Sequence, residues 1–295
     1  MNAAFHTTNR QKLYAMLQPS SVLLIFSGEE VCKTNDESYP FFADRDFVYL
    51  TGLTCKEAVL MALKDANGET TERLYILPPD FMAERWTGRR VKPAEAQAAS
   101  GVGDIRSTAR FDDDVHGLLA GGHYSLRVGC YEHLYLDLFR ASPADRDRSA
   151  QHFLRRTQQE YPFLRVENAN ALIRKLRLIK TPEEIEATRK AENITRAGIL
   201  AMMHASKPGM YEYQYKAAFD YALGQYGPEG PGFPSIISAG ANNFCIHFSA
   251  YTGQAQDGDM VLNDVGAQWD NHITDVSRGW PCNGRFSGQQ RTLYE

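Results

Sequence analysis

Short apolar runs alternate with helical stretches over about the first 165 residues, and this alternation limits the chain to a few architectures. Each run is closed by Gly, Asp, Asn or Pro, as strands commonly are. The runs predict strands at residues 22–26, 47–50, 58–63, 74–77 and 126–128. The stretches between them predict helices at residues 93–99, 112–119 and 144–160. We therefore expect an α/β domain with a mixed sheet.

The pattern changes after Val166. Residues 167–171 read ENANA and are the best candidate for a linker, which would divide the chain into domains at 1–170 and 171–295. Two domains also fit a length of 295 residues, at roughly 150 residues per domain.

The second part opens with helices. A basic helical stretch at 172–180 is followed by the sequence TPEE, which supplies a capping Thr181, a Pro at the first helical position and a Glu at the third. That helix should run to Ser206, because a Lys-Pro-Gly sequence follows it. A second amphipathic helix is predicted at 211–226, and strands at 233–238, 244–248, 260–266 and 273–280.

Composition excludes several classes of protein. Apolar residues make up 43% and charged residues 23%, which are ordinary globular values. The net charge of −4 argues against nucleic acid as a partner. No apolar run approaches the ~20 residues of a membrane span, and the first ten residues lack the apolar core of a signal peptide. The five cysteines are scattered without a C-x-x-C pair, so we expect a cytoplasmic protein.

Residues 260–280 carry the strongest chemical signal, two alternating segments around a polar turn. If a two-residue loop is centred between Trp269 and Asp270, Asp264 and Asp275 face each other directly. Leu262 and Ile273 share their face, so the carboxylates should be partly buried, and a divalent cation (Mn, Mg, Co or Zn) would relieve their repulsion. The alternative is a solvated hairpin whose aspartates face water.

Three neighbouring side chains receive simpler interpretations. His272 is an odd number of residues from Asp275, so it should point to the other face and not serve as a ligand. His247 lies in the β-like run CIHFS and, taken alone, such a His is more often a core or edge residue than a catalytic one. Cys245 is too far from His247 on a strand for a thiolate–imidazole pair, which argues against a cysteine peptidase.

Several blocks together resemble one family. NDVGAQWDNHITDVSRGWPCNGRFS is similar to the metal hairpin of the pita-bread metallopeptidases, in particular the Xaa-Pro aminopeptidases (aminopeptidase P) and prolidases. FPSIISAGANNFCIHFS matches the segment that ends in an active-site His. Other matching blocks are YPF at 39–41, DFVYLTG at 46–52, ERWTGRR at 84–90, LRLIKTPEEIEATRKAENITR at 176–196 and KPGMYEYQYKAAFDYALGQYG at 207–227.

The resemblance implies both a fold and an activity. The fold would be an N-terminal mixed-sheet domain of the creatinase/aminopeptidase P type followed by the first half of an α+β pita-bread domain. The activity would be hydrolysis of the Xaa-Pro bond, at the N-terminus of peptides or in dipeptides, by two divalent metal ions that are usually manganese. Asp264 would bind one metal, Asp275 would bridge the two, and His247 would contact the substrate near the scissile bond.

The sequence also departs from the family pattern. Phe233 stands where many relatives have Tyr, and Asn271-His272 replaces the usual Gly-Tyr after the turn. The family uses a further His and two Glu from the second half of its catalytic domain, and these would lie beyond Glu295. We therefore expect residues 1–295 to represent a truncated form that binds metal weakly and is inactive by itself.

Two alternatives remain open at this point. A pita-bread scaffold also serves as a non-catalytic peptide-binding module, and creatinase-like enzymes use it to hydrolyse other small C–N substrates. Retention of both Asp264 and Asp275 favours the peptidase, because a binding module has no electrostatic reason to keep two opposed carboxylates.

The N-terminal domain holds no cluster of ligands, so we expect it to contribute to self-association and not to chemistry. Its aromatic residues are of the kind that anchor interfaces, and the resemblance likewise implies a homo-oligomer. The expected anchors are Phe41, Phe42, Phe47, Tyr49 and Trp86. The expected partner is a proline-containing peptide, with neither nucleic acid nor membrane involved.

Overall fold

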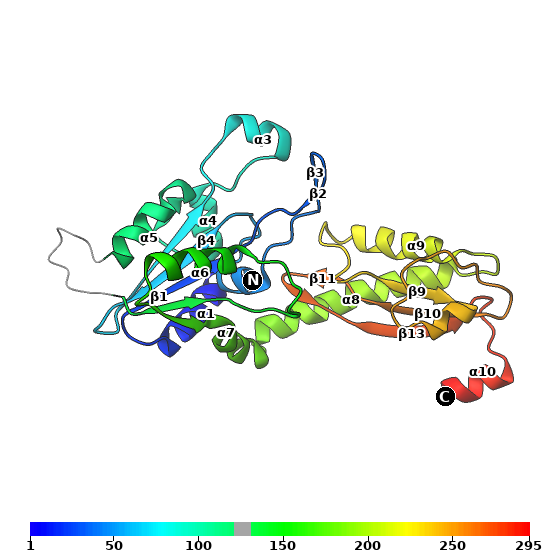
Figure 1. Cartoon of the computed structure of the whole chain (residues 1–295). Helices are drawn as coiled ribbons and strands as arrows, with labels where there is room; N and C mark the ends of the chain where they lie inside the picture. Colours follow the sequence, from blue (N-terminus) through cyan, green and yellow to red (C-terminus); the bar gives the residue numbers. More distant parts are fainter. Residues whose placement is uncertain (121–130) are drawn as a thin grey trace. The chain divides into compact units, whose positions relative to one another are not determined.

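The computed structural model describes residues 1–120 and 131–295, so the strand predicted at 126–128 lies outside the described residues. Contacts divide the chain into two compact units, Met1–Ile179 (unit 1) and Lys180–Glu295 (unit 2). Figure 1 shows the elements of each unit in chain order. Among the described helices, none is both long and apolar enough to cross a bilayer.

Unit 1 is built on a six-stranded mixed sheet, which confirms the predicted α/β class. The strand order is β6-β5-β4-β1-β7-β8, with β1–β7, β7–β8 and β5–β6 parallel and the other pairs antiparallel. The strands are β1 Ser21–Phe26, β4 Val59–Lys64, β5 Thr70–Ile76, β6 Ile105–Ser107, β7 His133–Leu136 and β8 Arg165–Asn168. A separate exposed hairpin pairs β2 Cys32–Thr34 with β3 Glu37–Ser38.

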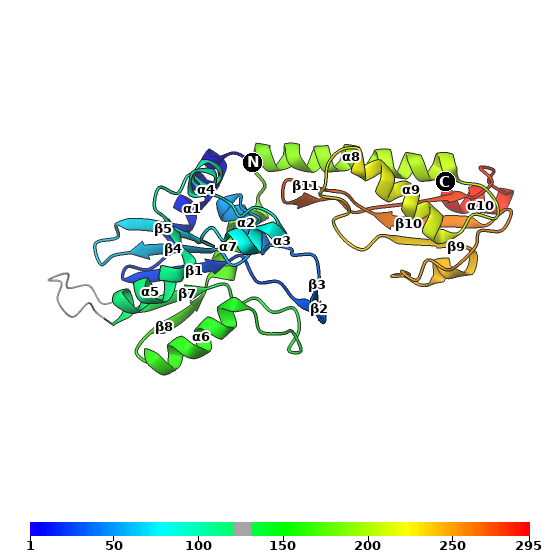
Figure 2. The ribbon, with the colours of Figure 1, turned by 90° about the horizontal axis from the view of Figure 1, so that it is seen from above.

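The central strands are apolar on both faces because helices cover both sides (Figure 2). On one face, Leu23 and Ile25 of β1 pack in a cluster with residues of α1 Ala3–Met16, α2 Arg45–Thr51, α4 Pro93–Ser100 and α7 Ala169–Leu178. On the other face, Val22 and Leu24 pack in a cluster with residues of α5 Phe111–Leu119 and α6 Ser149–Glu160. The remaining helices are α3 Phe81–Thr87 and the 3-10 turn η1 Thr108–Arg110.

Three sequence predictions for unit 1 need correction. The strand expected at 47–50 is part of helix α2, because the Asp44 carboxylate accepts from the amides of Asp46 and Phe47 and thereby caps a helix. The helix expected from residue 144 begins only at Ser149. The ENANA stretch is not a linker, since it completes strand β8 and starts α7, where Ala169 is fully buried.

Unit 2 packs two helices and a three-stranded antiparallel sheet around one core. The helices are α8 Pro182–Ala205 and α9 Glu212–Gly224, and the sheet order is β13-β10-β9, from β13 Val276–Pro281, β10 Met260–Val265 and β9 Ile236–Ala239. Helix α8 begins and ends as predicted, with the Thr181 hydroxyl accepting from the Glu184 amide. Gly198 lets the two helices approach closely, because a Cβ there would lie 2.5 Å from the Phe219 ring.

The remaining elements of unit 2 are short. They are the 3-10 turn η2 Gly240–Phe244, the strand pair β11 Gln268–Trp269 and β12 His272–Ile273, and helix α10 Gly288–Tyr294. The strand predicted at 244–248 is wrong, since η2 and a turn occupy these positions. The strand predicted at 273–280 is interrupted at Thr274 and Asp275, which belong to neither β12 nor β13.

Candidate metal centre

The aspartate hairpin forms, but its register differs from the predicted one. Asp264 pairs with Ser277 and not with Asp275, because the two-residue turn is Asp270-Asn271, one residue later than expected. Both turn residues have positive φ, 48° and 68°. A tight hairpin requires this conformation, and Asp and Asn adopt it more readily than Trp269 would.

The two carboxylates nevertheless interact. Asp275 lies in the break between β12 and β13, and a hydrogen bond with Asp264, together with the charge of Asp264, raises the pKa of Asp275. Asp264 also accepts a hydrogen bond of 2.8 Å from the Ser277 hydroxyl. The predicted partial burial holds for Asp264, whereas Asp275 and Ile273 are exposed. A cation would remove the repulsion that raises this pKa, so the pair fits two hard oxygen ligands of a divalent metal.

Helix α8 fixes the position of the break that carries Asp275. The Thr195 hydroxyl accepts from the Ala267 amide at 2.8 Å and forms a 2.7 Å hydrogen bond with the Thr274 hydroxyl. Gly266 passes so close to the opposite segment that a Cβ would lie 1.6 Å from the Thr274 carbonyl oxygen. Thr274 therefore points into the core, and the next residue, Asp275, is exposed.

His247 lies in a turn after η2 and is exposed, as are its neighbours Phe244 and Ile246, at 92% and 82%. Strand β9 does not continue to His247, because the side chain of Asn243 makes hydrogen bonds outside the strand pairing. Its Oδ1 accepts from Ser238 Oγ and its Nδ2 donates to the Met260 carbonyl. In the described ranges, no three His, Cys, Asp or Glu side chains gather as a metal site. The structure thus brings Asp264 and Asp275 together without adding His247 to the pair.

His272 contacts helix α8. Its Nε2 lies 3.4 Å from Glu184 Oε1, and its Nδ1 lies 3.0 Å from the Asp270 carbonyl oxygen. Glu184 is 2% exposed and also closes the N-terminal cap of α8 by accepting from the Thr181 amide. His272 thus ties the turn of the hairpin to the start of the helix.

A residue that the sequence analysis did not single out is the buried Glu212, at the first turn of α9. Its carboxylate contacts both ends of the segment that carries His247. An acidic residue in the first turn of a predicted helix was the available signal, but such residues are common there and face water as a rule.

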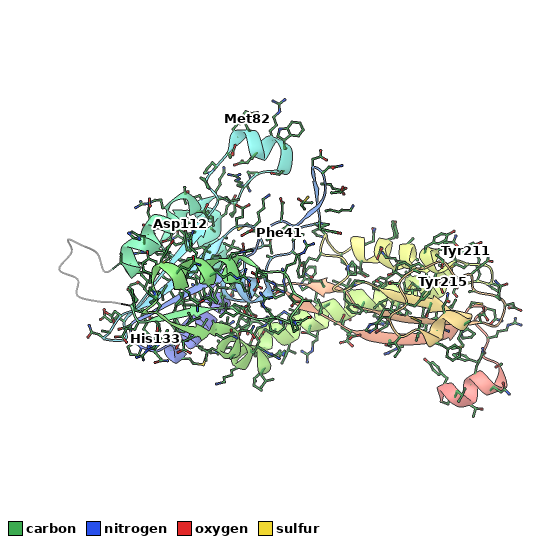
Figure 3. The ribbon with its side chains drawn as sticks, in the orientation of Figure 1. Phe41, Met82, Asp112, His133, Tyr211 and Tyr215 are labelled. Carbon is green, nitrogen blue, oxygen red and sulfur yellow. The ribbon has the colours of Figure 1, made fainter. Side chains whose placement is uncertain are left out.

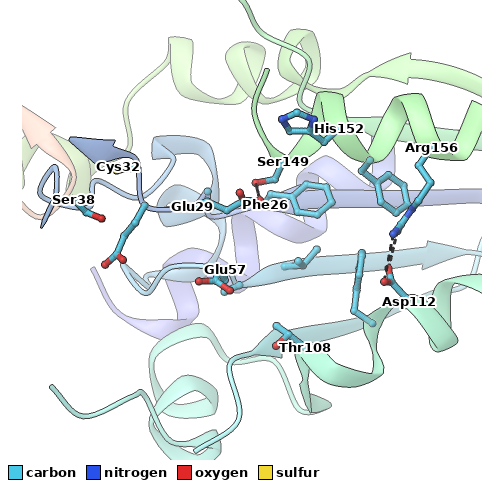
Figure 4. A pocket seen from close by; sticks show the side chains of 16 residues that line it. Phe26, Glu29, Cys32, Ser38, Glu57, Thr108, Asp112, Ser149, His152 and Arg156 are labelled. Atoms are coloured by element: carbon cyan, nitrogen blue, oxygen red, sulfur yellow. Dashed lines mark hydrogen bonds and ion pairs between the residues drawn. The ribbon is translucent and has the colours of Figure 1, made fainter. Parts of the chain in front are cut away.

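Unit 1 contains an open cavity of about 920 Å³, shown in Figure 4, which none of the three predicted site residues lines. Phe26, Phe111 and Phe153 form its apolar part. Two pairs of its polar groups contact each other: Arg156 pairs with Asp112 at 2.7 Å, and Ser149 Oγ donates to the Glu29 carboxylate at 2.9 Å.

Comparisons with known proteins match both units. Residues 6–126 match the family model "Aminopeptidase P, N-terminal domain", and residues 186–295 match "Metallopeptidase family M24". The Xaa-Pro aminopeptidase of Escherichia coli is 29% identical over 286 residues, which cover 97% of this chain and 64% of that protein. The chain therefore spans somewhat less than two thirds of the length of this curated relative.

Solved structures agree. A provisionally assigned aminopeptidase P from Bacillus anthracis superposes with a TM-score of 0.93 at 31% identity, covering 100% of this chain and 68% of that one. Aminopeptidase P from E. coli with the inhibitor Pro-Leu gives 0.86 at 27% identity, covering 100% and 65%. A zinc-substituted form of the E. coli protein in complex with product gives 0.85 at 27%, covering 100% and 66%. Unit 1 is thus an aminopeptidase P-type domain, unit 2 is part of a pita-bread domain, and the chain belongs to the aminopeptidase P family of metallopeptidases.

Proposed function

We propose that the protein carrying this sequence hydrolyses the peptide bond between an N-terminal residue and a following proline, in longer peptides or in dipeptides. The observation that carries the proposal is the interacting pair Asp264 and Asp275, held in a hairpin of the family type. The names of the similar proteins support the substrate class, since they include Xaa-Pro aminopeptidases and a complex with Pro-Leu.

In this proposal Asp264 and Asp275 hold two divalent ions, most readily manganese, with Co, Zn or Mg as alternatives. When bound, such ions polarise a carbonyl and lower the pKa of water. The protein's own part is to keep both carboxylates on one rigid hairpin, braced by Thr195, and to present the His247 imidazole to the substrate near the scissile bond.

We further propose that residues 1–295 alone are inactive and bind metal weakly. The described residues supply two carboxylates and one imidazole, whereas the family uses a further His and two Glu. With few ligands, little preorganisation offsets the dehydration of the ion.

An assay with a peptide that begins Xaa-Pro tests both statements. Residues 1–295 with added Mn²⁺ should release no product above background, and the E. coli enzyme serves as the positive control. A form extended by about 120–150 further residues, the size of one half-domain, should cleave Xaa-Pro and spare a matched Xaa-Ala peptide. Equal cleavage of the two peptides would overturn the assigned specificity, and chelator-sensitive turnover by residues 1–295 would overturn the inactivity.

We also propose that unit 1 mediates homo-oligomer formation. Support comes from exposed aromatic side chains: Trp86 on α3 is 84% exposed and Phe42 is 60% exposed. Met82, labelled on the same helix in Figure 3, is 62% exposed. Phe47 and Tyr49, expected as interface anchors, are instead core residues at 0% and 2%, because α2 buries them against α1. Sedimentation of the protein and of a W86A/F42A variant tests this role.

We also propose that the protein acts in a reducing compartment such as the cytoplasm. The four described cysteines, Cys32, Cys55, Cys245 and Cys282, are all free thiols, as intracellular proteins usually keep them.

A further inference from the structure

Glu212 is a fully buried carboxylate whose negative charge is met by hydrogen-bond donors from elsewhere in unit 2. Oε1 accepts from the Ala239 amide and from Asn242 Nδ2, both at 2.9 Å. Oε2 accepts from the Gly253 amide at 2.6 Å. The exposure of Glu212 is 0%. Hydrogen bonds to an ionised, buried acceptor are among the strongest in proteins, so these three groups are held firmly.

These donors mark the two ends of one segment. Ala239 and Asn242 lie at its start, Gly253 lies at its end, and His247 lies between them. The backbone adds a further link, because the Glu212 amide donates to the Gly253 carbonyl at 2.9 Å. We call residues 239–253 the His247 segment.

The packing at Gly253 leaves no room for a side chain. A Cβ there would lie 2.5 Å from Asn242 Nδ2 and 2.6 Å from Glu212 Oε1. The start and the end of the His247 segment therefore meet around one carboxylate. The first turn of α9 supplies that carboxylate, and α9 is anchored in the core of unit 2 by Tyr215 and Phe219.

The residues around His247 have little support of their own. Phe244, Cys245, Ile246 and His247 are all exposed, and none belongs to a strand. The side chain of Asn243 links the start of the segment to Ser238 and Met260. The position of the imidazole therefore depends on this anchor and on Glu212, which joins the two ends of the segment.

We propose that Glu212 is a positioning residue for His247. It closes the segment into a fixed loop and so sets where the imidazole meets a substrate. The inference rests on the proposed function in one respect, the contact between His247 and the substrate. The closure of the loop itself does not depend on any activity.

Replacing Glu212 with Gln tests the closure. Gln keeps one acceptor oxygen, which can serve Ala239 and Asn242, but its NH₂ group then faces the Gly253 N–H, and two donors cannot bond. One end of the loop should open. Amide exchange of peptides from 239–253 should become about ten- to hundredfold faster, as expected for loss of one hydrogen bond to a charged group. Exchange in β10 should stay unchanged.

Two further variants keep the measurement decisive. Gly253→Ala leaves Glu212 in place but forces a methyl group between it and Asn242, so it should speed exchange in the same peptides even if E212Q folds poorly. Thr188→Val is the matched control, because Thr188 lies on α8 and its hydroxyl donates to the Glu184 carbonyl, outside the His247 segment. Exchange at 239–253 that is unchanged in E212Q and G253A would overturn the proposal.

A double-mutant cycle in a form that cleaves an Xaa-Pro peptide tests the link to His247. In the protein that retains His247, E212Q should lower kcat/KM at least tenfold. In an H247A background it should lower kcat/KM less than about twofold, because the effects of coupled residues are non-additive. An equal loss in both backgrounds would show that Glu212 acts elsewhere and would overturn the role. Failure of every form to cleave Xaa-Pro counts against the proposed function, whereas unchanged exchange counts against Glu212.

Discussion

Thr195 on α8 and Thr274 in the aspartate hairpin share a 2.7 Å hydrogen bond between buried hydroxyl groups. Thr274 immediately precedes Asp275, so one side chain on the helix determines where the strand breaks and where the carboxylate emerges. The same Thr195 oxygen accepts from the Ala267 amide on the other arm of the hairpin.

Thr195→Val should therefore destabilise unit 2 by about 1–3 kcal/mol, because it leaves a buried amide without an acceptor. Urea unfolding followed by tryptophan fluorescence measures this, since Trp269 and Trp280 lie in unit 2. Thr188→Val is the control: Thr188 is on the same helix and bonds only to the Glu184 carbonyl within it. It should change stability by less than about 0.5 kcal/mol. Equal effects of the two substitutions would contradict the role of Thr195.

Asp264→Asn and Asp275→Asn should each weaken Mn²⁺ binding at least tenfold in calorimetry, because each removes one of two charged ligands. Asp257→Asn is the control, since Asp257 lies in unit 2 and pairs with Asn283 instead. Tight binding that survives both hairpin substitutions would contradict the assigned site.

The aspartate pair should also make the stability of unit 2 depend on pH. The hydrogen bond and charge of Asp264 raise the pKa of Asp275, so the folded state holds a proton that the unfolded state releases. Without metal, the stability of unit 2 should fall as pH rises from about 4, the unfolded pKa of an aspartate, through the raised folded pKa. D275N should lack this fall and be at least as stable as the unsubstituted protein at pH 7. Urea midpoints at pH 4 and pH 7 provide the measurement.

The sequence could predict those features that local chemistry determines. Helix α8 was located at both ends because Thr181 and Glu184 form a reciprocal cap and a Lys-Pro-Gly sequence follows. The hairpin was recognised, but its turn was placed one residue too early, which shifts each cross-strand partner by two residues. The alternation of polar and apolar residues determines only which face of the hairpin each residue occupies, so it does not distinguish registers that differ by two residues. The choice between these registers depends on which turn residues accept positive φ, here Asp270 and Asn271.

Features that depend on tertiary contacts were missed. The sequence FVYL is a short apolar run of the kind that predicts a buried strand, yet it lies in helix α2 because Asp44 caps the helix and because both Phe47 and Tyr49 are buried. Glu212 could not be recognised either, since its donors lie 27 to 41 residues further along the chain.

Arg10 should be the most sensitive charged position of unit 1. It is fully buried, it contacts both oxygens of Glu72 at 2.8 and 2.9 Å, and it donates to the carbonyls of Leu50 and Ser100. Arg10→Met removes the cation from Glu72, which keeps only the Tyr14 hydroxyl as a donor, and leaves two carbonyls without this donor, so it should cost about 3–5 kcal/mol. Arg89→Met, which breaks the exposed Arg89–Glu95 pair, should leave the unfolding midpoint nearly unchanged. Chemical denaturation that ranks the two variants equally would contradict this difference.

Asp137, directly after β7, should make unit 1 sensitive to pH. Its burial, followed by the charges of Asp44 and Asp46, raises the pKa of Asp137 to about 7. The other members of the cluster have partners of their own: Arg177 pairs with Asp46, which also accepts from the Asn170 side-chain amide, and Arg148 pairs with Asp44. Asp137 therefore stays protonated in the folded state up to about pH 7, whereas the unfolded chain releases this proton near pH 4.

Because the folded state binds the extra proton, the stability of unit 1 should fall between about pH 4 and pH 7 and level off above it, with a slope of up to about 1.4 kcal/mol per pH unit. Asp137→Asn carries no proton to lose, so its profile should be flatter over this window and its stability at pH 8 higher than that of the unsubstituted protein. Asp36→Asn, at an exposed position in the β2–β3 turn, should keep the original slope. Hydrogen exchange of the backbone amides in β1 and β7 peptides, measured in increasing urea at pH 5, 6, 7 and 8, reports the stability of unit 1 directly. A D137N profile as steep as that of D36N would assign the pH dependence to other groups.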